Sequence, residues 1–328
     1  MNISAADLLG QAQAAHGRLT NHVRRTPLVQ LDDIGRDACD TAMLWCKFEH
    51  LQKTGSFKAR GALNCALTAT PQRDIVAFSA GNHAIAAAFA AQTTGAHAKV
   101  IMPAKASALR IARARSFGAE IILTSTGAEA AALALEIAEK EDRLLIHPFE
   151  DPAVIAGAAT VGLEAFEDAL GEIDAVVIAI GGGGLAGGVA GAIKALAPDC
   201  AIYGVEPDGA ANMRASLDAG RPLQAKPPNT IADSLAPPFC LPYSFALCKT
   251  FLDDVVTVSE TDMLKAMKLW YDEVNLVLEP AAAAPLAALR GPLATRLTGT
   301  RTALILCGAN ISAAQFSSQT RTVLSDKN

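Results

Sequence analysis

Four consecutive glycines stand between a continuous apolar run and a stretch of helix-forming residues. The run, residues 175–180, is typical of a strand buried on both faces, and the helix is expected to extend to about Leu196. A strand that passes through glycines into a helix is typical of parallel α/β sheets. Glycines also let the backbone wrap an anion with successive N–H groups, and the helix dipole favours the negative charge. The sequence therefore predicts a phosphate site at Gly181, Gly182, Gly183 and Gly184.

Strand-like and helical segments alternate in other parts of the chain as well. The strand-like runs 74–78, 99–102 and 120–123 each precede a helical stretch. With 328 residues, the chain exceeds the size at which a single core usually stops growing. We therefore expect an α/β fold with parallel sheets, helices on both faces and two lobes.

Lys58 follows a Gly-Ser turn and Phe57 and is predicted to open a helix. Apolar surroundings disfavour the ammonium form of a lysine, and an uncharged amine is what a Schiff-base lysine needs. A solvated lysine on a helix surface is the alternative interpretation. Two further motifs favour the interpretation of Lys58 as a Schiff-base lysine.

The first is the loop that joins the strand-like run 74–78 to the alanine-rich helix after it. Such a junction presents free backbone N–H groups and the positive end of a helix, which together suit a carboxylate. Asn82 adds a side-chain donor. The alternative is that Asn82 caps the helix and that His83 is packed behind it.

The second is the glycine loop, which also matches a dinucleotide-binding pattern. Gly182, Gly184 and Gly187 fit G-x-G-x-x-G, and Glu206 follows the next strand, where a ribose would bind. A nicotinamide-dependent oxidoreductase is thus one alternative. That interpretation leaves Lys58 and the Asn82 loop without a role, whereas an aldehyde cofactor with a phosphate uses all three motifs.

Composition excludes several other classes of protein. The net charge of −5 gives no basic field for nucleic acid or an anionic membrane. Seven cysteines without C-x-x-C spacing argue against a disulfide framework and a zinc site. The N-terminus carries no signal-peptide pattern, and no apolar run reaches the roughly 20 residues of a membrane span. We expect a soluble, cytoplasmic protein whose partners are small molecules.

Motifs in a characteristic order extend over nearly the whole chain. They lie at residues 25–28, 56–62, 79–83, 147–149, 181–185, 204–207, 230–233, 278–281 and 306–310. With these motifs the chain resembles the pyridoxal-phosphate enzymes of fold type II, in the branch of serine and threonine dehydratases and serine racemase. The resemblance implies a two-lobed fold like that of the tryptophan synthase β subunit. It also implies a large cofactor-binding domain (1–72 and 146–328), a small domain inserted in it (73–145) and a homodimer.

The resemblance implies roles for individual residues. Lys58 would bind pyridoxal phosphate as a Schiff base and then act as general base on the substrate's Cα proton. The other implied cofactor contacts are Phe57, Asn82, Gly181, Gly182, Gly183, Gly184, Leu185, Glu279 and Cys307. The implied substrate-carboxylate loop consists of Ser79, Ala80, Gly81, Asn82 and His83.

Two departures from the family pattern bear on the activity. Ala80 replaces the serine with which serine racemase protonates the second face, so elimination is favoured over racemisation. Glu206, the carbonyl of Ala210 and Asn212 stand where serine racemase binds a divalent cation. Because Asn212 replaces a carboxylate, we assign no metal and leave a site at Glu206 and Ala210 open.

The implied activity is a dehydratase, or ammonia-lyase, that converts a β-hydroxy amino acid to a 2-oxo acid and ammonia. L-Serine and L-threonine are the default substrates, and a serine racemase-like activity is an alternative. 3-Hydroxyaspartate is another, since several arginines could hold its second carboxylate. These are Arg60, Arg110, Arg113 and Arg115.

Overall fold

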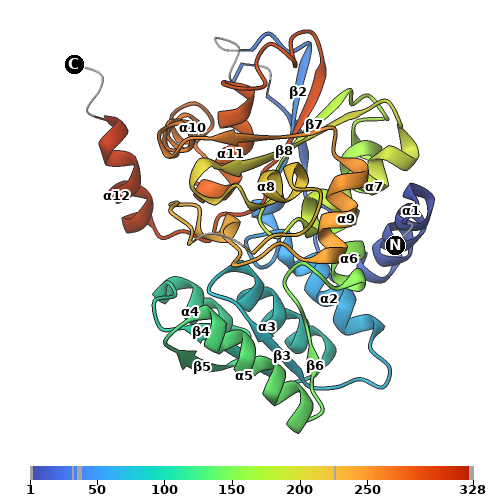
Figure 1. Cartoon of the computed structure of the whole chain (residues 1–328), viewed down its shortest axis with the longest axis vertical. Coiled ribbons are helices and arrows are strands. Elements are labelled where there is room, and N and C mark those ends of the chain that lie inside the picture. Colours follow the sequence, from blue (N-terminus) through green and yellow to red (C-terminus); the bar gives the residue numbers. More distant parts are fainter. Residues whose placement is uncertain (1–2, 32, 35–38, 225–226, 325–328) are drawn as a thin grey trace.

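The computed structural model describes residues 3–31, 33–34, 39–224 and 227–324 and contains two β-sheets (Figure 1). The larger sheet has six strands in the order β1-β2-β10-β7-β8-β9. These are β1 (Leu28–Gln30), β2 (Met43–Lys47), β10 (Arg301–Ile305), β7 (Ala175–Ala179), β8 (Ala201–Pro207) and β9 (Asp254–Val258). Strands β1 and β2 pair antiparallel, and all other neighbouring strands of this sheet pair parallel. The predicted parallel sheet is thus confirmed, and β1 is an antiparallel strand at its edge.

The smaller sheet has four parallel strands in the order β5-β4-β3-β6. These are β3 (Ile75–Phe78), β4 (Ala98–Pro103), β5 (Glu120–Thr124) and β6 (Leu144–Leu145). Helices α3 (Asn82–Thr94), α4 (Ala108–Ser116) and α5 (Gly127–Lys140) connect them. We call residues 75–145 the small sheet unit and the rest the large sheet unit. That residues 73–145 form a separate domain remains a prediction.

Helices cover both faces of the six-stranded sheet (Figure 1). One group consists of α1 (Ala5–Leu19), α6 (Pro152–Asp168), α7 (Gly184–Leu196) and α9 (Pro242–Phe251). The other consists of α10 (Glu260–Val274), α11 (Pro280–Leu289) and α12 (Ala313–Leu324). The short helix α8 (Asn212–Asp218) follows β8. None of the helices in the described part of the chain combines the length and apolarity of a membrane span.

Helix α2 (Lys58–Thr68) joins the two units, because it packs on α3 on one side and on α6 on the other. Small side chains permit this close approach. A Cβ at Gly157 would lie 2.5 Å from the Arg60 carbonyl oxygen, and one at Gly61 would lie 2.6 Å from the Val154 carbonyl oxygen. Because α2 also packs on α3, the first residues of these helices, Lys58 and Asn82, belong to one packed pair.

Candidate active site

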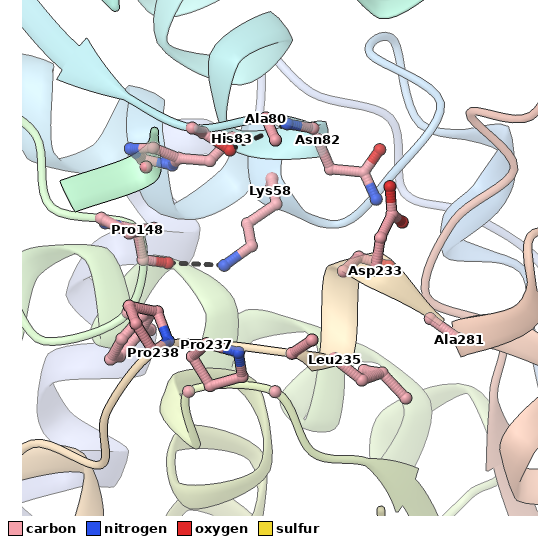
Figure 2. A pocket seen from close by; sticks show the side chains of 18 of the residues that line it. Lys58, Ala80, Asn82, His83, Pro148, Asp233, Leu235, Pro237, Pro238 and Ala281 are labelled. Carbon is pink, nitrogen blue, oxygen red and sulfur yellow. Dashed lines mark hydrogen bonds between the residues drawn. The ribbon is translucent and has the colours of Figure 1, made fainter. Parts of the chain in front are cut away.

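A cavity of about 680 Å³ lies between the two sheet units, at the carboxyl ends of the parallel strands (Figure 2). Ligands of open α/β sheets bind in this position. Its lining includes every residue that the sequence assigned to the cofactor or the substrate. These are Phe57, Lys58, Ser79, Ala80, Gly81, Asn82, His83, Gly181, Gly182, Gly183, Gly184, Leu185, Glu279 and Cys307. Motifs from distant parts of the chain thus meet in one site.

Lys58 is the first residue of α2, as predicted, and points into the cavity (Figure 2). Its Nζ donates a hydrogen bond to the carbonyl oxygen of Pro148 at 2.5 Å and lies 4.9 Å from the centre of the Phe57 ring. Burial lowers the pKa of the Lys58 amine to about 8, although Cys307 acts in the opposite direction. A useful fraction of the amine is therefore uncharged and nucleophilic near neutral pH.

The glycine loop leads from β7 into α7, which begins at Gly184. Gly183 has φ +88°, a conformation that favours glycine. A Cβ at Gly182 would lie 2.1 Å from the Phe149 ring, and one at Gly181 would lie 2.8 Å from the Ser234 carbonyl oxygen. The backbone therefore lines the cavity without side chains in the way. The first N–H groups of a helix have no intrahelical acceptor, which makes this loop a suitable phosphate site.

The predicted carboxylate loop connects β3 to α3. The Ser79 hydroxyl accepts a hydrogen bond from the Gly81 N–H at 3.0 Å. The Asn82 side chain is held from the large sheet unit, because its Nδ2 donates to Glu279 at 2.7 Å and its Oδ1 accepts from Asn310 Nδ2 at 2.6 Å. Asn82 is thus oriented by residues that lie far later in the chain.

His83 is almost completely buried, and its Nε2 lies 2.8 Å from the carbonyl oxygen of Ile146. Burial lowers the pKa of the ring to about 3, and the positive charge of Lys58 acts in the same direction. The imidazole is therefore neutral and must donate from Nε2 to reach a carbonyl oxygen. This arrangement matches the alternative in which His83 is packed behind the loop.

Glu279 and Cys307 also line the cavity. Burial raises the pKa of Glu279, while Arg110 and hydrogen bonds from Asn82 and Ser234 oppose the shift. Burial also raises the pKa of the Cys307 thiol, which stays protonated. The N–H of Phe57 donates to the Cys307 carbonyl at 3.1 Å, so Cys307 is tied to the segment that carries Lys58.

Of the four arginines considered as a carboxylate clamp, only Arg110 lines the cavity. Arg60 is fully buried and forms ion pairs of 2.7 Å with Glu49 and with Glu164. Arg113 contacts the Asn310 side chain, and Arg115 is exposed. Arg110 itself is paired with Asp233 and lies 3.6 Å from Glu279.

Glu206 does not line the cavity, and Ala210 does not either. The Glu206 carboxylate accepts hydrogen bonds of 2.8 Å from the N–H groups of Met213 and Arg214, so it caps α8. The described residues contain no cluster of three or more His, Cys, Asp or Glu side chains that could hold a metal. Both oxygens of the Glu206 carboxylate thus already accept a hydrogen bond from the first turn of α8.

Sequence reasoning missed three contributors to the site. Asp233 and Asn310 belong to motifs that the sequence did single out, but the partners of their side chains are far away in the chain. The third is an apolar wall formed by Leu235, Pro237, Pro238 and Phe239. No local pattern marks that segment as part of a site.

His147 is expected to make the stability of the protein depend on pH. Its Nδ1 accepts hydrogen bonds from the N–H groups of Phe149 and Glu150, and burial, followed by the charge of Lys58, lowers its pKa from 6.5 to about 4. Above pH 6.5 both the folded and the unfolded ring are neutral. Below it only the unfolded ring gains a proton, so stability falls until about pH 4.

We expect the free energy of unfolding to fall by about 1 to 3 kcal/mol between pH 6.5 and 4 through this residue. Denaturant unfolding at several pH values measures the slope. His147→Asn should reduce the slope, whereas His97→Asn, at an exposed position, should leave it as it is. An equal slope in the His147 variant and the wild type would contradict the assignment.

The chain is similar to known proteins over most of its length. A family model described as pyridoxal-phosphate dependent enzyme matches residues 19–308. Phenylserine dehydratase of Ralstonia pickettii is 41% identical over 302 residues, which cover 91% of this chain and 92% of that protein. L-Threonine ammonia-lyase of Thermotoga maritima is 37% identical over 92% of this chain and 75% of its own. The crystal structure of a threonine deaminase from T.th. has a TM-score of 0.87 at 39% identity and covers 93% of this chain and 98% of its own.

Proposed function

The chain belongs to the family of pyridoxal-phosphate dependent enzymes, and we propose that it dehydrates β-hydroxy amino acids whose β-substituent is large and apolar. It is a lyase of the dehydratase, or ammonia-lyase, class. The observation that carries the substrate proposal is the apolar wall across the cavity from the carboxylate loop, with Lys58 between them (Figure 2).

The site fits pyridoxal phosphate. Lys58 supplies an amine of which a fraction is uncharged near neutral pH and can react with the aldehyde, and the glycine loop at the start of α7 suits the phosphate. The buried Cys307 thiol is a neutral partner for the pyridine nitrogen. When bound, the cofactor accepts the electrons that remain when the Cα proton is removed.

The protein's own residues then have separate tasks. Lys58 Nζ takes the proton from the substrate's Cα. The loop around Ser79 and Gly81 holds the substrate's carboxylate through backbone N–H groups at the start of α3. Loss of the Cα proton and of the β-hydroxyl, followed by hydrolysis, yields a 2-oxo acid and ammonia. Ala80 offers only a methyl group to the cavity, which supports elimination over racemisation.

The sequence placed serine and threonine first and kept 3-hydroxyaspartate as an alternative. A second carboxylate needs a cation that is free to bind it. Arg110 is already paired with Asp233, which leaves Lys105, exposed to solvent at the cavity lining, as a cation that a second carboxylate could reach. By contrast, Leu235 is buried, and Pro237 and Phe239 are half-buried. A phenyl ring or a similar apolar group suits this wall, and the similarity to a phenylserine dehydratase supports it.

A substrate panel tests the proposal. We expect kcat/KM for L-threo-phenylserine to exceed that for L-serine by about 10- to 100-fold, since burial of one large apolar group contributes about 1.5 to 3 kcal/mol. Ammonia and 2-oxo acid release are measured for both, with L-threonine and L-threo-3-hydroxyaspartate for comparison. L-Serine is the matched control because its Cβ carries only hydrogen besides the hydroxyl group. A clear preference for hydroxyaspartate would refute the apolar assignment.

That the enzyme acts in the cytoplasm and as a homodimer remains a prediction from the sequence. Size-exclusion chromatography with light scattering measures the oligomeric state directly.

A further inference from the structure

Arg110 connects the two sheet units across the mouth of the cavity. It lies on α4 of the small sheet unit, and all of its polar partners belong to the large one. Its Nη1 and Nη2 donate to the two carboxylate oxygens of Asp233 at 2.5 Å and 3.2 Å. Its Nε donates to the carbonyl oxygen of Asn310 at 3.0 Å. A bidentate ion pair of this kind fixes the orientation of the guanidinium as well as its distance from the carboxylate.

The same guanidinium lies directly against the carboxylate loop. A Cβ at Gly81 would be 3.3 Å from Arg110 Nη1 and 3.5 Å from its Cζ. Gly81 therefore lets the loop rest on the flat face of the guanidinium. The guanidinium of Arg110 is thus a direct neighbour of the backbone that is to hold the substrate's carboxylate.

The two partners differ in exposure. The side chain of Arg110 is 4% exposed, whereas that of Asp233 is 52% exposed. Loss of Asp233 would leave Arg110 with the Asn310 carbonyl and, at 3.6 Å, with Glu279. The Asp233 contact can thus be removed without leaving a buried charge unpaired, so it can be tested separately from the fold.

We propose that Arg110 is a positioning residue for the loop that binds the substrate's carboxylate. Its ion pair with Asp233 fixes the position of the Arg110 side chain. The ion pair holds α4, and with it the loop at Ser79 to Asn82, in place over the large sheet unit. Arg110 does not bind the substrate, because its donors are directed to Asp233 and Asn310. The inference rests on the proposed function in one respect, namely that the ligand is an amino acid with a free carboxylate.

The test uses the holoenzyme and L-alanine, which has the carboxylate of a substrate but no β-hydroxyl group. In Asp233→Asn we expect the dissociation constant of L-alanine to rise about tenfold, between the effects of an exposed and a buried ion pair. With a substrate that the enzyme converts, KM should rise while kcat changes less than about threefold. The reason is that the variant loses the same binding energy in the enzyme–substrate complex and in the transition state. Hydrogen exchange of the backbone around residues 79–82 and in α4 should become faster.

Asp218→Asn is the matched control. Asp218 is also a half-exposed aspartate paired with an arginine, but its partner Arg214 lies on the same helix, α8. This variant should change neither L-alanine binding nor the exchange of residues 79–82. Asp233→Glu, which keeps the charge, should recover part of the affinity.

Hydrogen exchange decides the question even where no substrate is eliminated, so failure of this inference is distinct from failure of the proposed function. Exchange in Asp233→Asn equal to that in Asp218→Asn would overturn it. A fall in kcat at constant KM would also overturn it, since that result would place Asp233 in the chemical step.

Discussion

Replacement of Lys58 by alanine is expected to lower turnover at least about a thousandfold. A positioned general base alone contributes about 10²- to 10⁴-fold, and the same amine is the group that would bond to the cofactor's aldehyde. No other lysine combines a position at the start of a helix, contact with the cavity and a pKa lowered by burial in the described part of the chain. Release of 2-oxo acid measures the loss.

Lys53→Ala is the matched control for this variant. Lys53 lies shortly before Lys58 in the chain and is exposed, so its removal should change turnover less than about threefold. Cofactor should still bind to Lys58→Ala to some extent, because the glycine loop does not depend on the amine. Substantial turnover by Lys58→Ala would mean that another group removes the Cα proton.

Replacement of Gly182 by alanine is expected to weaken cofactor binding by about 100-fold. The new methyl carbon would lie 2.1 Å from the Phe149 ring, so the ring or the loop must move. Phe149 is buried and packs edge-on against His147 with 4.8 Å between ring centres, which leaves the ring little room. Overpacking of this kind costs about 1 to 3 kcal/mol, and here it displaces the backbone that would hold the phosphate. Titration of the apoprotein with pyridoxal phosphate measures the affinity.

Gly17→Ala is the control, because nothing lies within 4 Å of a Cβ at that position of α1. It should bind the cofactor normally and be slightly more stable, by about 0.5 to 1 kcal/mol. Adding Phe149→Ala to Gly182→Ala should restore part of the affinity if the loss is steric. Normal cofactor binding by Gly182→Ala alone would place the phosphate elsewhere.

The sequence alone determined those parts of the protein that depend on neighbours along the chain. The apolar run before the glycine loop became β7, and the helix after it ends at Leu196 as expected. Lys58 and Asn82 open α2 and α3 because local turn chemistry and side-chain patterns determine where helices begin. The predicted site residues were found in one cavity because parallel strands bring their carboxyl ends to the same edge.

The tertiary structure decided the partners of each side chain. Arg60 and Arg110 looked alike in the sequence, yet one is buried against Glu49 and Glu164 and the other lies at the cavity with Asp233. Glu206 became a helix cap. The periodicity of the sequence does not predict these side-chain partners, because each partner depends on which distant segment packs against the residue.

The apolar wall is a further feature of the site that local sequence patterns could not predict. Its residues, 235–239, have no repeating pattern, and they face the loop at Ser79 to Asn82 across the cavity only because the two sheet units pack together around α2. Local propensity determines where a helix or strand begins, but the shape of a cavity depends on the relative placement of elements that are far apart in the chain. The chemistry of this protein was therefore readable from its sequence, whereas the apolar wall that we propose selects its substrate became visible only in the folded chain.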